Sequence, residues 1–311
     1  MKVTVVGAGN VGSTCAQIIA EKNIVQEVVL IDIEEGISEG KSLDLWQTAP
    51  IRHYETRLTG STNDYSKTAD SEVVVITSGI TRKPGMSRDD LISANVGIVK
   101  SSTENVVKYS PNTKIIVVTN PLDVMTYVAY VASKKLKNEV IGMSGIIDTA
   151  RYRAFLAEAL DVSPRDIQAL LMGGHGDTMV PLPRYTTVSG IPVTELIDEE
   201  KLNAIIERTK VGGSELVNLM GTSAWYAPAT AAAQMVEAIV LDQKRIFPCC
   251  VKLEGEYGLN DIFVGVPVKL GKNGVEKIIE VALNEDEMKL LINSANSVKS
   301  VMDVLDGMNI L

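Results

Sequence analysis

The chain is poor in histidine and cysteine, and it contains no long uninterrupted apolar run. Its three cysteines, Cys15, Cys249 and Cys250, form neither a disulfide framework nor a C-x-x-C pair, so we expect buried thiols in a reducing cytoplasm. The opening MKVTVVGAG is not expected to be a secretory signal, because it leads directly into a strand and a glycine turn, and no segment is long and apolar enough to span a membrane. The sequence therefore predicts a cytoplasmic protein without a membrane partner.

Basic charge is also scarce. Thirty lysines and arginines stand against 39 aspartates and glutamates, which gives a formal net charge of -9. Because nucleic acid phosphates require a basic face, the sequence predicts no nucleic acid partner. A few local arginines can still reverse the field inside a cleft, so a small anionic ligand remains compatible with this charge. The 45% hydrophobic content is that of a folded protein, and 311 residues suffice for two domains.

The first half of the chain alternates short β-branched segments with helical patterns. KVTVVG, EVVLID, SEVVVITSG and TKIIVVTNP are apolar on both faces and are flanked by turn residues, which is typical of buried parallel strands. Helical patterns lie between them, for example over residues 11–22 and 87–109. Such alternation predicts an α/β fold with a doubly wound parallel sheet.

The second half has a different pattern and predicts a smaller α+β domain. We place the change of domain near residue 145, which gives domains 1–144 and 145–311. The expected elements are a helix over 148–160, a strand DIQALLMG, antiparallel strands in VPLPRYTTVSGIPV, helices over 201–220 and 227–242, a strand meander FPCCVKLEGEYGLNDIFVGVPVKL and a terminal helix over 285–306.

A glycine-rich turn follows the first expected strand. In VTVVGAGNVGSTCAQIIA, the spacing of Gly7, Gly9 and Gly12 allows a tight turn, a close approach to a pyrophosphate, and packing of helix on strand. Alone this motif is a weak signal. Asp32 strengthens it, because it ends the second strand 20 residues beyond Gly12, where a carboxylate can accept from both ribose hydroxyls. The sequence thus predicts a dinucleotide-binding (Rossmann) domain.

Acidic residues at the end of the second strand also indicate which dinucleotide, NAD or NADP, is bound. A 2′-phosphate would meet Asp32, with Glu34 and Glu35 close behind, and no arginine lies nearby in the sequence to receive it. We therefore expect NAD and not NADP.

Three further segments carry groups that could act on a substrate. GITRKPGMSRDD places Arg82, Lys83 and Arg88 in a loop after the fourth strand, where parallel sheets bind ligands, although a solvated basic loop is an equal alternative. Asn120, in VVTNPLD, is either an ordinary turn residue or an amide that holds substrate and cofactor. In GIIDTARYR, Asp148 and Arg151 share a helix face, as a surface ion pair or with separate partners, an imidazole for Asp148 and a carboxylate for Arg151.

One of the two histidines stands in an unusual setting. His175, in LLMGGHGDTMVP, is flanked by Gly174 and Gly176, which we interpret as room for a substrate to approach the ring. A carboxylate on one ring nitrogen would fix the tautomer and leave the other nitrogen to exchange a proton. His53 has no comparable surroundings and is expected to be structural or on the surface.

With these motifs in place, the chain resembles the lactate/malate dehydrogenase family, and within it the lactate-dehydrogenase-like malate dehydrogenases. The likeness covers nearly the whole chain, through GAGNVG, ITSGITRKPGMSRDDL, VVTNPLDVMTY, GMSGIIDTARYR, MGGHGDTMVPLPRY and SAWYAPATA. One departure is MGTSAWYAPA where the family often has TGSAYYAPA, so Trp225 replaces a tyrosine.

The resemblance implies a role for each matching residue. His175 would be the proton acceptor and Asp148 its partner, while Arg151 would bind the substrate C1 carboxylate. Arg88 would polarise the reacting oxygen on a loop that closes over the substrate, and Asn120 would contact substrate and cofactor. No metal is implied, and a homotetramer or homodimer is expected. The NAD site would be lined by Gly7, Gly9, Asn10, Val11, Gly12, Asp32, Thr77, Gly79, Asn95, Val118 and Asn120.

The expected reaction is the reversible oxidation of (S)-malate to oxaloacetate. Arg82 favours this dicarboxylate over lactate, because a closed site would otherwise hold an unpaired cation at a cost of several kcal/mol. Three alternatives remain: a lactate dehydrogenase, an NAD-dependent glycosidase, and a redox-sensing NAD-binding module. The glycosidase would need a metal bound through cysteine and histidine, and no cysteine lies near His175 in the sequence. The sensing module would not need His175, Asp148, Arg151 and Arg88 together.

Overall fold

The architecture comes from a computed structural model of the 311-residue chain, which describes residues 1–80 and 88–307. For residues 88, 89, 306 and 307 it describes the backbone only.

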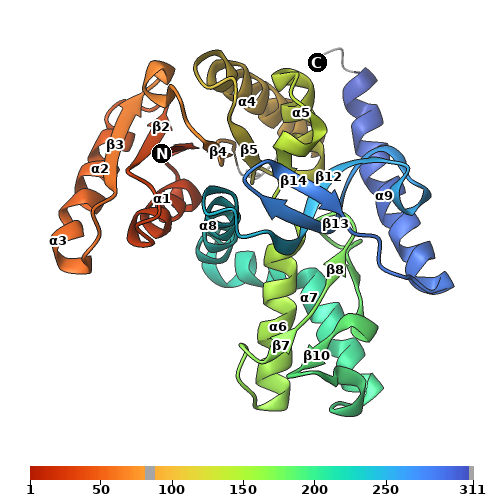
Figure 1. Cartoon of the computed structure of the whole chain (residues 1–311). Coiled ribbons are helices and arrows are strands. Elements are labelled where there is room, and N and C mark those ends of the chain that lie inside the picture. Colours follow the sequence, from red (N-terminus) through yellow and green to blue (C-terminus); the bar gives the residue numbers. More distant parts are fainter. Residues whose placement is uncertain (81–87, 308–311) are drawn as a thin grey trace.

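One large sheet runs through the described part of the chain (Figure 1). Its order is β14-β13-β12-β6-β5-β4-β1-β2-β3, and β1 to β6 pair in parallel whereas β12 to β14 are antiparallel. Strands β1, β4 and β5 are almost wholly buried, as their apolar runs predict. The strands are β1 (Lys2–Val6), β2 (Glu27–Asp32), β3 (Arg57–Thr62), β4 (Val73–Ile76), β5 (Lys114–Val117), β6 (Val140–Gly142), β12 (Arg245–Glu254), β13 (Asn260–Gly271) and β14 (Gly274–Ile278).

Helices cover both faces of this sheet, so the predicted doubly wound α/β fold is confirmed. The helices α1, α2 and α8 pack on one face, and α4 and α5 on the other (Figure 1). The terminal helix α9 packs against α5 and β13. Their bounds are α1 (Asn10–Glu21), α2 (Ile37–Gln47), α3 (Ala49–Arg52), α4 (Arg88–Tyr109), α5 (Leu122–Ser133), α8 (Tyr226–Val240) and α9 (Glu285–Gly307).

A second lobe lies below the sheet in Figure 1 and supplies the predicted α+β part. Its helices α6 (Gly145–Leu160) and α7 (Glu199–Met220) pack together through a separate apolar cluster that includes Tyr152, Leu156 and Leu202. Short strands complete it: β7 (Ile167–Gln168), β8 (Leu171–Met172), β9 (Val180–Pro181), β10 (Thr187–Val188) and β11 (Ile191–Pro192). Within the residues that the structure describes, 3-10 helices span Tyr65–Thr68, Lys137–Glu139, Pro183–Tyr185, Val193–Glu195 and Glu256–Gly258.

Two strand segments differ from the sequence-based expectation. DIQALLMG, predicted as one strand, is divided between β7, which pairs with β10, and β8, which pairs with β9. Next to β8, Gly173 forms an isolated antiparallel bridge with Gly265 in β13, which links this segment to the main sheet. The meander of the second half extends the N-terminal sheet, because Cys250 in β12 pairs with Gly142 in β6.

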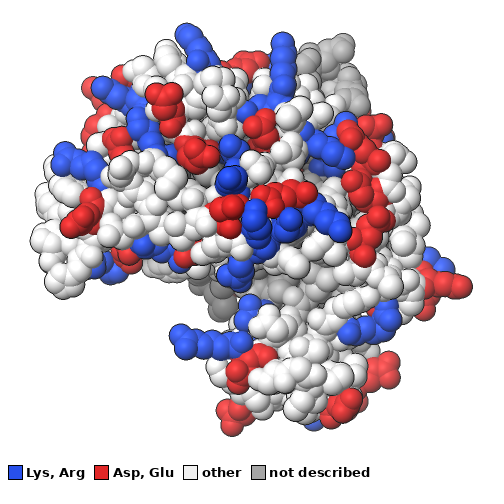
Figure 2. Space-filling model, in the orientation of Figure 1, with Lys and Arg blue, Asp and Glu red and all other residues white. Residues whose placement is uncertain are grey.

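Charge is mixed on the face shown in Figure 2. Lysine and arginine side chains intermingle with acidic ones over β12, β13 and β14. Lys244 and Lys269 each approach Glu276, at 3.1 and 3.2 Å, and Lys252 approaches Asp261 at 3.3 Å. Among the helices of residues 1–80 and 88–307, none has both the length and the apolar character needed to cross a membrane.

Candidate active site

The glycine-rich turn lies at the point where the strand order of the sheet reverses. Strand β1 has β2 on one side and β4 on the other, and ligands of open α/β sheets bind beyond the carboxyl ends of such strands. Gly7 has a φ of +103°, and a Cβ at Gly12 would lie 1.8 Å from the carbonyl oxygen of Gly7. Thr77, after β4, donates from Oγ1 to the carbonyls of Val6 and Gly7 at 3.0 and 3.1 Å. The turn is therefore tightly closed between the two strands.

The N-terminus of α1 is suited to an anion. Its N-cap is Gly9, no side chain of the described residues caps it, and its first turn contains no acidic residue. The N–H groups at the start of a helix are not used within the helix, and the helix dipole favours negative charge there. Asn10 and Val11 form the first turn of this helix. A dinucleotide pyrophosphate fits this position.

Asp32, at the end of β2, is held beside the same turn. Its Oδ2 accepts from the backbone N–H of Ala8 at 2.6 Å, and its Oδ1 accepts from Ile33 and Glu34 at 2.8 and 3.1 Å. Lys41 in α2 donates to the carbonyl of Ala8 at 2.6 Å. Lys41 could not be predicted from the sequence, because nothing in its local pattern indicates that α2 folds back onto the turn.

The remaining predicted cofactor residues form the neighbouring edge of the sheet. Asn95 is 1% exposed, and its amide is committed to backbone groups: Oδ1 accepts from Ile80 N–H at 2.8 Å, and Nδ2 donates to the carbonyl of Asn120 at 2.8 Å. A Cβ at Gly79 would lie 2.5 Å from Thr119 Cγ2. Asn95 thus ties the loops after β4 and β5 together, and Val118, the first residue after β5, is buried. These residues lie together at the carboxyl ends of β4 and β5.

A histidine and an aspartate meet between the two lobes. Oδ2 of Asp148, in α6, lies 2.9 Å from Nδ1 of His175, in the loop between β8 and β9. Asp148 is 2% exposed and His175 is 20% exposed. Because a carboxylate can only accept, Nδ1 carries the proton, and Nε2 is the nitrogen left to exchange a proton with a ligand. The sequence-based pairing of these two residues agrees with this geometry.

Electrostatics in this pair favour the protonated imidazole. Burial lowers the pKa of His175, but the charge of Asp148, its hydrogen bond and the charge of Asp123 outweigh this effect, so the pKa lies above its ordinary value. The charge of Arg151 opposes the rise.

Arg151 lies on the same face of α6 as Asp148 and is 12% exposed. Its Nη1 is 3.4 Å from the other oxygen of Asp148, Oδ1, and 3.5 Å from the carbonyl of Thr209 in α7. The expectation of separate partners is therefore incomplete, since Asp148 lies between the imidazole and the guanidinium. Such a site can hold an anion beside a proton-exchanging ring.

The loop that carries His175 is fixed by two residues that the sequence analysis did not identify. Oδ2 of Asp123, in α5, accepts from the backbone N–H of His175 at 2.8 Å. Oγ of Ser294, in α9, accepts from Gly174 N–H at 2.8 Å. Asp123 stood in the motif VVTNPLD, but no local signal tied it to a histidine 52 positions away.

The interpretation of Gly174 as space for a substrate is wrong. A Cβ at this position would lie 2.8 Å from Val298 Cγ2 in α9, so the glycine is required by packing. Gly176 has a φ of +140° and open space around it, which agrees with access to the ring from that side.

Comparison with known proteins shows the family of the chain. The model of the lactate/malate dehydrogenase NAD-binding domain matches residues 1–142, and that of the lactate/malate dehydrogenase α/β C-terminal domain matches residues 146–306. The chain belongs to the lactate/malate dehydrogenase family. The family confirms the predicted NAD cofactor, and with it the expectation of an NAD-dependent dehydrogenase.

Relatives of this family are similar over their whole length. A curated malate dehydrogenase from Cytophaga hutchinsonii is 68% identical over 308 residues, which is 99% of each chain. The solved malate dehydrogenase from Salinibacter ruber is 57% identical, with a TM-score of 0.95 over 99% of this chain and 98% of that one. A lactate dehydrogenase from Cryptosporidium parvum, solved with lactic acid and β-nicotinamide adenine dinucleotide, reaches 0.94 at 38% identity, over 98% of each chain. Backbone similarity alone therefore does not separate the two substrates.

The structure does not describe the side chains of three residues that were predicted for the substrate site. Arg82 and Lys83 lie outside the described residues, and Arg88 begins α4 with its backbone alone described.

His53 is exposed at the end of α3, as expected. Trp225 is half-buried at the start of α8, with its ring centroid 5.1 Å from that of Tyr226.

Other features of the described chain lie apart from this dehydrogenase site. Residues 1–80 and 88–307 hold no group of three or more histidine, cysteine, aspartate or glutamate side chains arranged for a metal ion.

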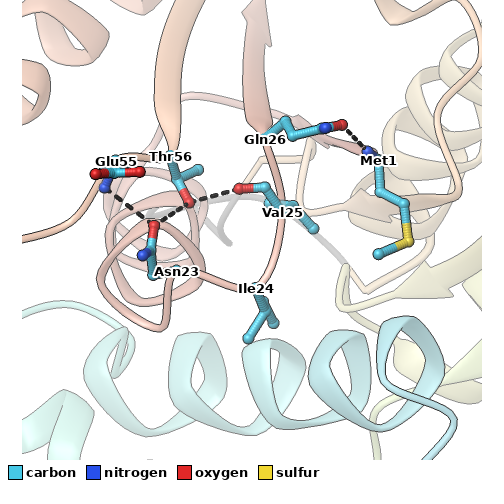
Figure 3. A pocket seen from close by; sticks show the side chains of 7 residues that line it. All are labelled: Met1, Asn23, Ile24, Val25, Gln26, Glu55 and Thr56. Carbon is cyan, nitrogen blue, oxygen red and sulfur yellow. Dashed lines mark hydrogen bonds between the residues drawn. The ribbon is translucent and has the colours of Figure 1, made fainter.

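A pocket at the amino ends of β1, β2 and β3 is shown in Figure 3. There Oδ1 of Asn23 accepts from Glu55 N–H at 3.0 Å and from Thr56 Oγ1 at 3.4 Å. This pocket is at the opposite edge of the sheet from the glycine-rich turn. Its lining residues are Met1, Asn23, Ile24, Val25, Gln26, Glu55 and Thr56.

Proposed function

We propose that the chain catalyses the reversible NAD-dependent oxidation of (S)-malate to oxaloacetate, a step of the tricarboxylic acid cycle. The observation that carries this proposal is the hydrogen bond of 2.9 Å between His175 Nδ1 and Asp148 Oδ2, beside the Arg151 guanidinium. It combines a proton-exchanging group with a cation for a carboxylate. The full-length relatives named malate dehydrogenase support the choice of substrate.

His175, with Asp148 as its hydrogen-bond partner, transfers the proton of the substrate hydroxyl group. NAD, when bound, exchanges a hydride with C2 of the substrate. In oxidation, neutral His175 accepts the hydroxyl proton at Nε2, and Asp148 stabilises the imidazolium that results. In reduction, the imidazolium returns the proton to the carbonyl oxygen. The raised pKa of His175 maintains the imidazolium at higher pH than an unperturbed histidine would.

Cationic and amide groups bind and orient the substrate. Arg151 binds the C1 carboxylate, for which a planar guanidinium is suited. Arg88 stabilises the charge that develops on the reacting oxygen, and Asn120 contacts both substrate and cofactor. The position of Asn120 in the loop after β5, linked through its carbonyl to Asn95, supports the last role.

Arg82 selects the four-carbon dicarboxylate. Oxaloacetate and pyruvate share the keto-acid end, but only oxaloacetate has a second carboxylate. An unpaired guanidinium in a closed site would cost several kcal/mol, and the second carboxylate removes this cost. The similarity of the fold to a lactate dehydrogenase keeps lactate as the second candidate substrate.

NADH oxidation measured with oxaloacetate and pyruvate side by side tests the proposal. We expect kcat/KM for oxaloacetate to exceed that for pyruvate by at least ~100-fold. Equal rates, or a preference for pyruvate, would make the chain a lactate dehydrogenase. NADH binding without turnover of either keto acid would instead support a redox-sensing module.

We further propose that the chain consists of an NAD-binding domain, 1–144, and a substrate domain, 145–311. The hydrogen bond between Asp148 and His175, both of which lie within 145–311, supports this division. We propose a homotetramer, with a homodimer as the alternative, in the cytoplasm. Exposed apolar side chains support an oligomer, and light scattering distinguishes the two states. They include Leu43, Ile51, Val211, Val217, Leu219 and Tyr226.

A further inference from the structure

Two adjacent glycines, Gly212 and Gly213, lie in the interior of α7. This helix runs without a break from Glu199 to Met220 and has its own end signals: the Asp198 side chain accepts from Lys201 N–H, and Gly221 ends the helix with a φ of +69°. Gly212 and Gly213 serve neither end. Glycine is among the poorest residues for a helix interior, so two in succession weaken α7 unless one of them is needed for another reason.

The two glycines have different surroundings. Gly212 is buried and faces α6, whereas Gly213 is exposed. A Cβ at Gly212 would lie 2.3 Å from Cδ of Arg151, 2.8 Å from its Nε and 3.4 Å from its Cζ. A Cβ at Gly213 would meet nothing within 4 Å. Only the first glycine is therefore in contact with the site.

Arg151 lies directly against the backbone of α7. Its Nη1 is 3.5 Å from the carbonyl of Thr209, one turn before Gly212, and 3.4 Å from Oδ1 of Asp148 on its own helix. Helices α6 and α7 lie side by side in the lower lobe (Figure 1). The guanidinium is thus confined between Asp148 on one side and the helix surface at positions 209 and 212 on the other.

Any side chain at position 212 would displace this arginine. The overlap falls on Cδ and Nε, which lie in the middle of the Arg151 side chain, so the side chain could relieve it only by adopting a different rotamer. A new rotamer moves the guanidinium away from Asp148 and Thr209. Bidentate recognition of a carboxylate depends on the orientation of the planar fork, and small displacements of binding groups reduce rates strongly.

We propose that Gly212 is a positioning residue for substrate binding: by lacking a side chain, it lets Arg151 lie against α7 with its guanidinium directed at the C1 carboxylate of the 2-keto or 2-hydroxy acid. The inference rests on the role proposed for Arg151. Gly212 contacts no reacting atom and acts only through this arginine.

Gly212→Ala and Gly213→Ala provide the matched comparison. Both exchange glycine for alanine in the same turn of α7, and both improve the helix propensity. We expect Gly212→Ala to lower kcat/KM for oxaloacetate at least ~10-fold, mainly through a higher KM, with Kd for NADH and Tm close to wild type. Gly213→Ala should retain the wild-type KM. Equal KM values in the two variants would overturn the proposal, and so would a Tm of Gly212→Ala far below wild type, because the effect would then be one of packing.

The same pair in an Arg151→Gln background separates this inference from the proposed function. If Gly212 acts through Arg151, adding Gly212→Ala to Arg151→Gln should lower kcat/KM by less than ~2-fold further. A full additional loss would show that Gly212 acts by another route. Wild-type kinetics of Arg151→Gln alone would instead refute the role of Arg151 in the proposed function.

Discussion

The carboxylate of Asp123 accepts a hydrogen bond of 2.8 Å from the backbone N–H of His175. Asp123 lies at the start of α5 and is 5% exposed, while His175 comes from the loop between β8 and β9. Burial raises the pKa of Asp123, and the hydrogen bond from His175 opposes this rise only in part. The charge of Asp123 also raises the pKa of His175, so a second carboxylate besides Asp148 acts on the imidazole.

Asp123→Asn should move the pH profile of the enzyme to lower pH. Asparagine retains an oxygen that can accept from His175 N–H but removes a charge that raises the pKa of His175. In the proposed mechanism, reduction of oxaloacetate consumes the imidazolium of His175. Its kcat/KM should therefore fall as the pH rises through the pKa of His175, and it should fall at lower pH in the variant. Malate oxidation needs neutral His175 and should extend to lower pH.

Ser294→Ala is the control for this shift. It removes the hydrogen bond from Gly174 N–H to a neutral side chain in the same loop, at a cost of about 1–3 kcal/mol in stability. We expect a lower Tm with the limb of the pH profile unmoved. Superimposable profiles of Asp123→Asn and the wild type would show that the charge of Asp123 is not felt by the ring.

His175→Asn should separate chemistry from cofactor binding. The asparagine amide can still meet Asp148 but cannot exchange a proton with the substrate, so turnover should fall ~100-fold or more. Kd for NADH, measured by fluorescence titration, should stay near wild type, because the glycine-rich turn and Asp32 are untouched. Activity close to wild type would contradict the acid-base assignment.

The parts of the structure that sequence could predict depend on local pattern. The strands β1, β2, β4 and β5 follow from β-branched runs, and the turn from Gly7 to Gly12 follows from its spacing between a strand and a helix. The pairing of His175 with Asp148 required knowledge of a family as well, because the two residues come from different segments. Here the sequence prediction and the geometry agree.

Contacts between distant segments could not be predicted in this way. Lys41 reaches Ala8 from α2, Asp123 meets His175 across 52 positions, and Gly212 faces Arg151 from another helix. None of these residues has a local pattern that distinguishes it from its neighbours. For Gly174, the local pattern suggested a role that the structure does not support. Its position beside His175 was interpreted as space for a substrate, whereas α9 packs against it.

Arg82→Gln tests the basis of substrate choice. If Arg82 has the proposed role, removing its guanidinium eliminates the partner of the second carboxylate and also removes the penalty for a substrate that lacks one. We expect kcat/KM for oxaloacetate to fall at least ~100-fold and the relative use of pyruvate to rise. Steady-state assays with both keto acids measure this, and Lys83→Gln serves as the neighbouring control. An unchanged preference in Arg82→Gln would show that specificity lies elsewhere in the pocket.

Asp32→Asn tests the choice between NAD and NADP. The carboxylate at the end of β2 accepts from three backbone N–H groups, those of Ala8, Ile33 and Glu34, so its orientation is fixed. A hydrogen bond to a charged group contributes about 1.5–3 kcal/mol, which corresponds to roughly 10- to 100-fold in affinity. The variant should therefore bind NADH at least ~10-fold more weakly.

The preference of Asp32→Asn for NADH over NADPH should also decrease, because a 2′-phosphate would no longer face the negative charge of Asp32. Glu35→Gln is the matched control: Glu35 is exposed, three residues further along, and its substitution removes one charge from the same region. If the charge of Asp32 acts at the ribose, Glu35→Gln should alter the NADH/NADPH ratio of kcat/KM by less than ~3-fold. Equal changes in the two variants would mean that the diffuse acidic field, and not the carboxylate of Asp32, excludes NADP.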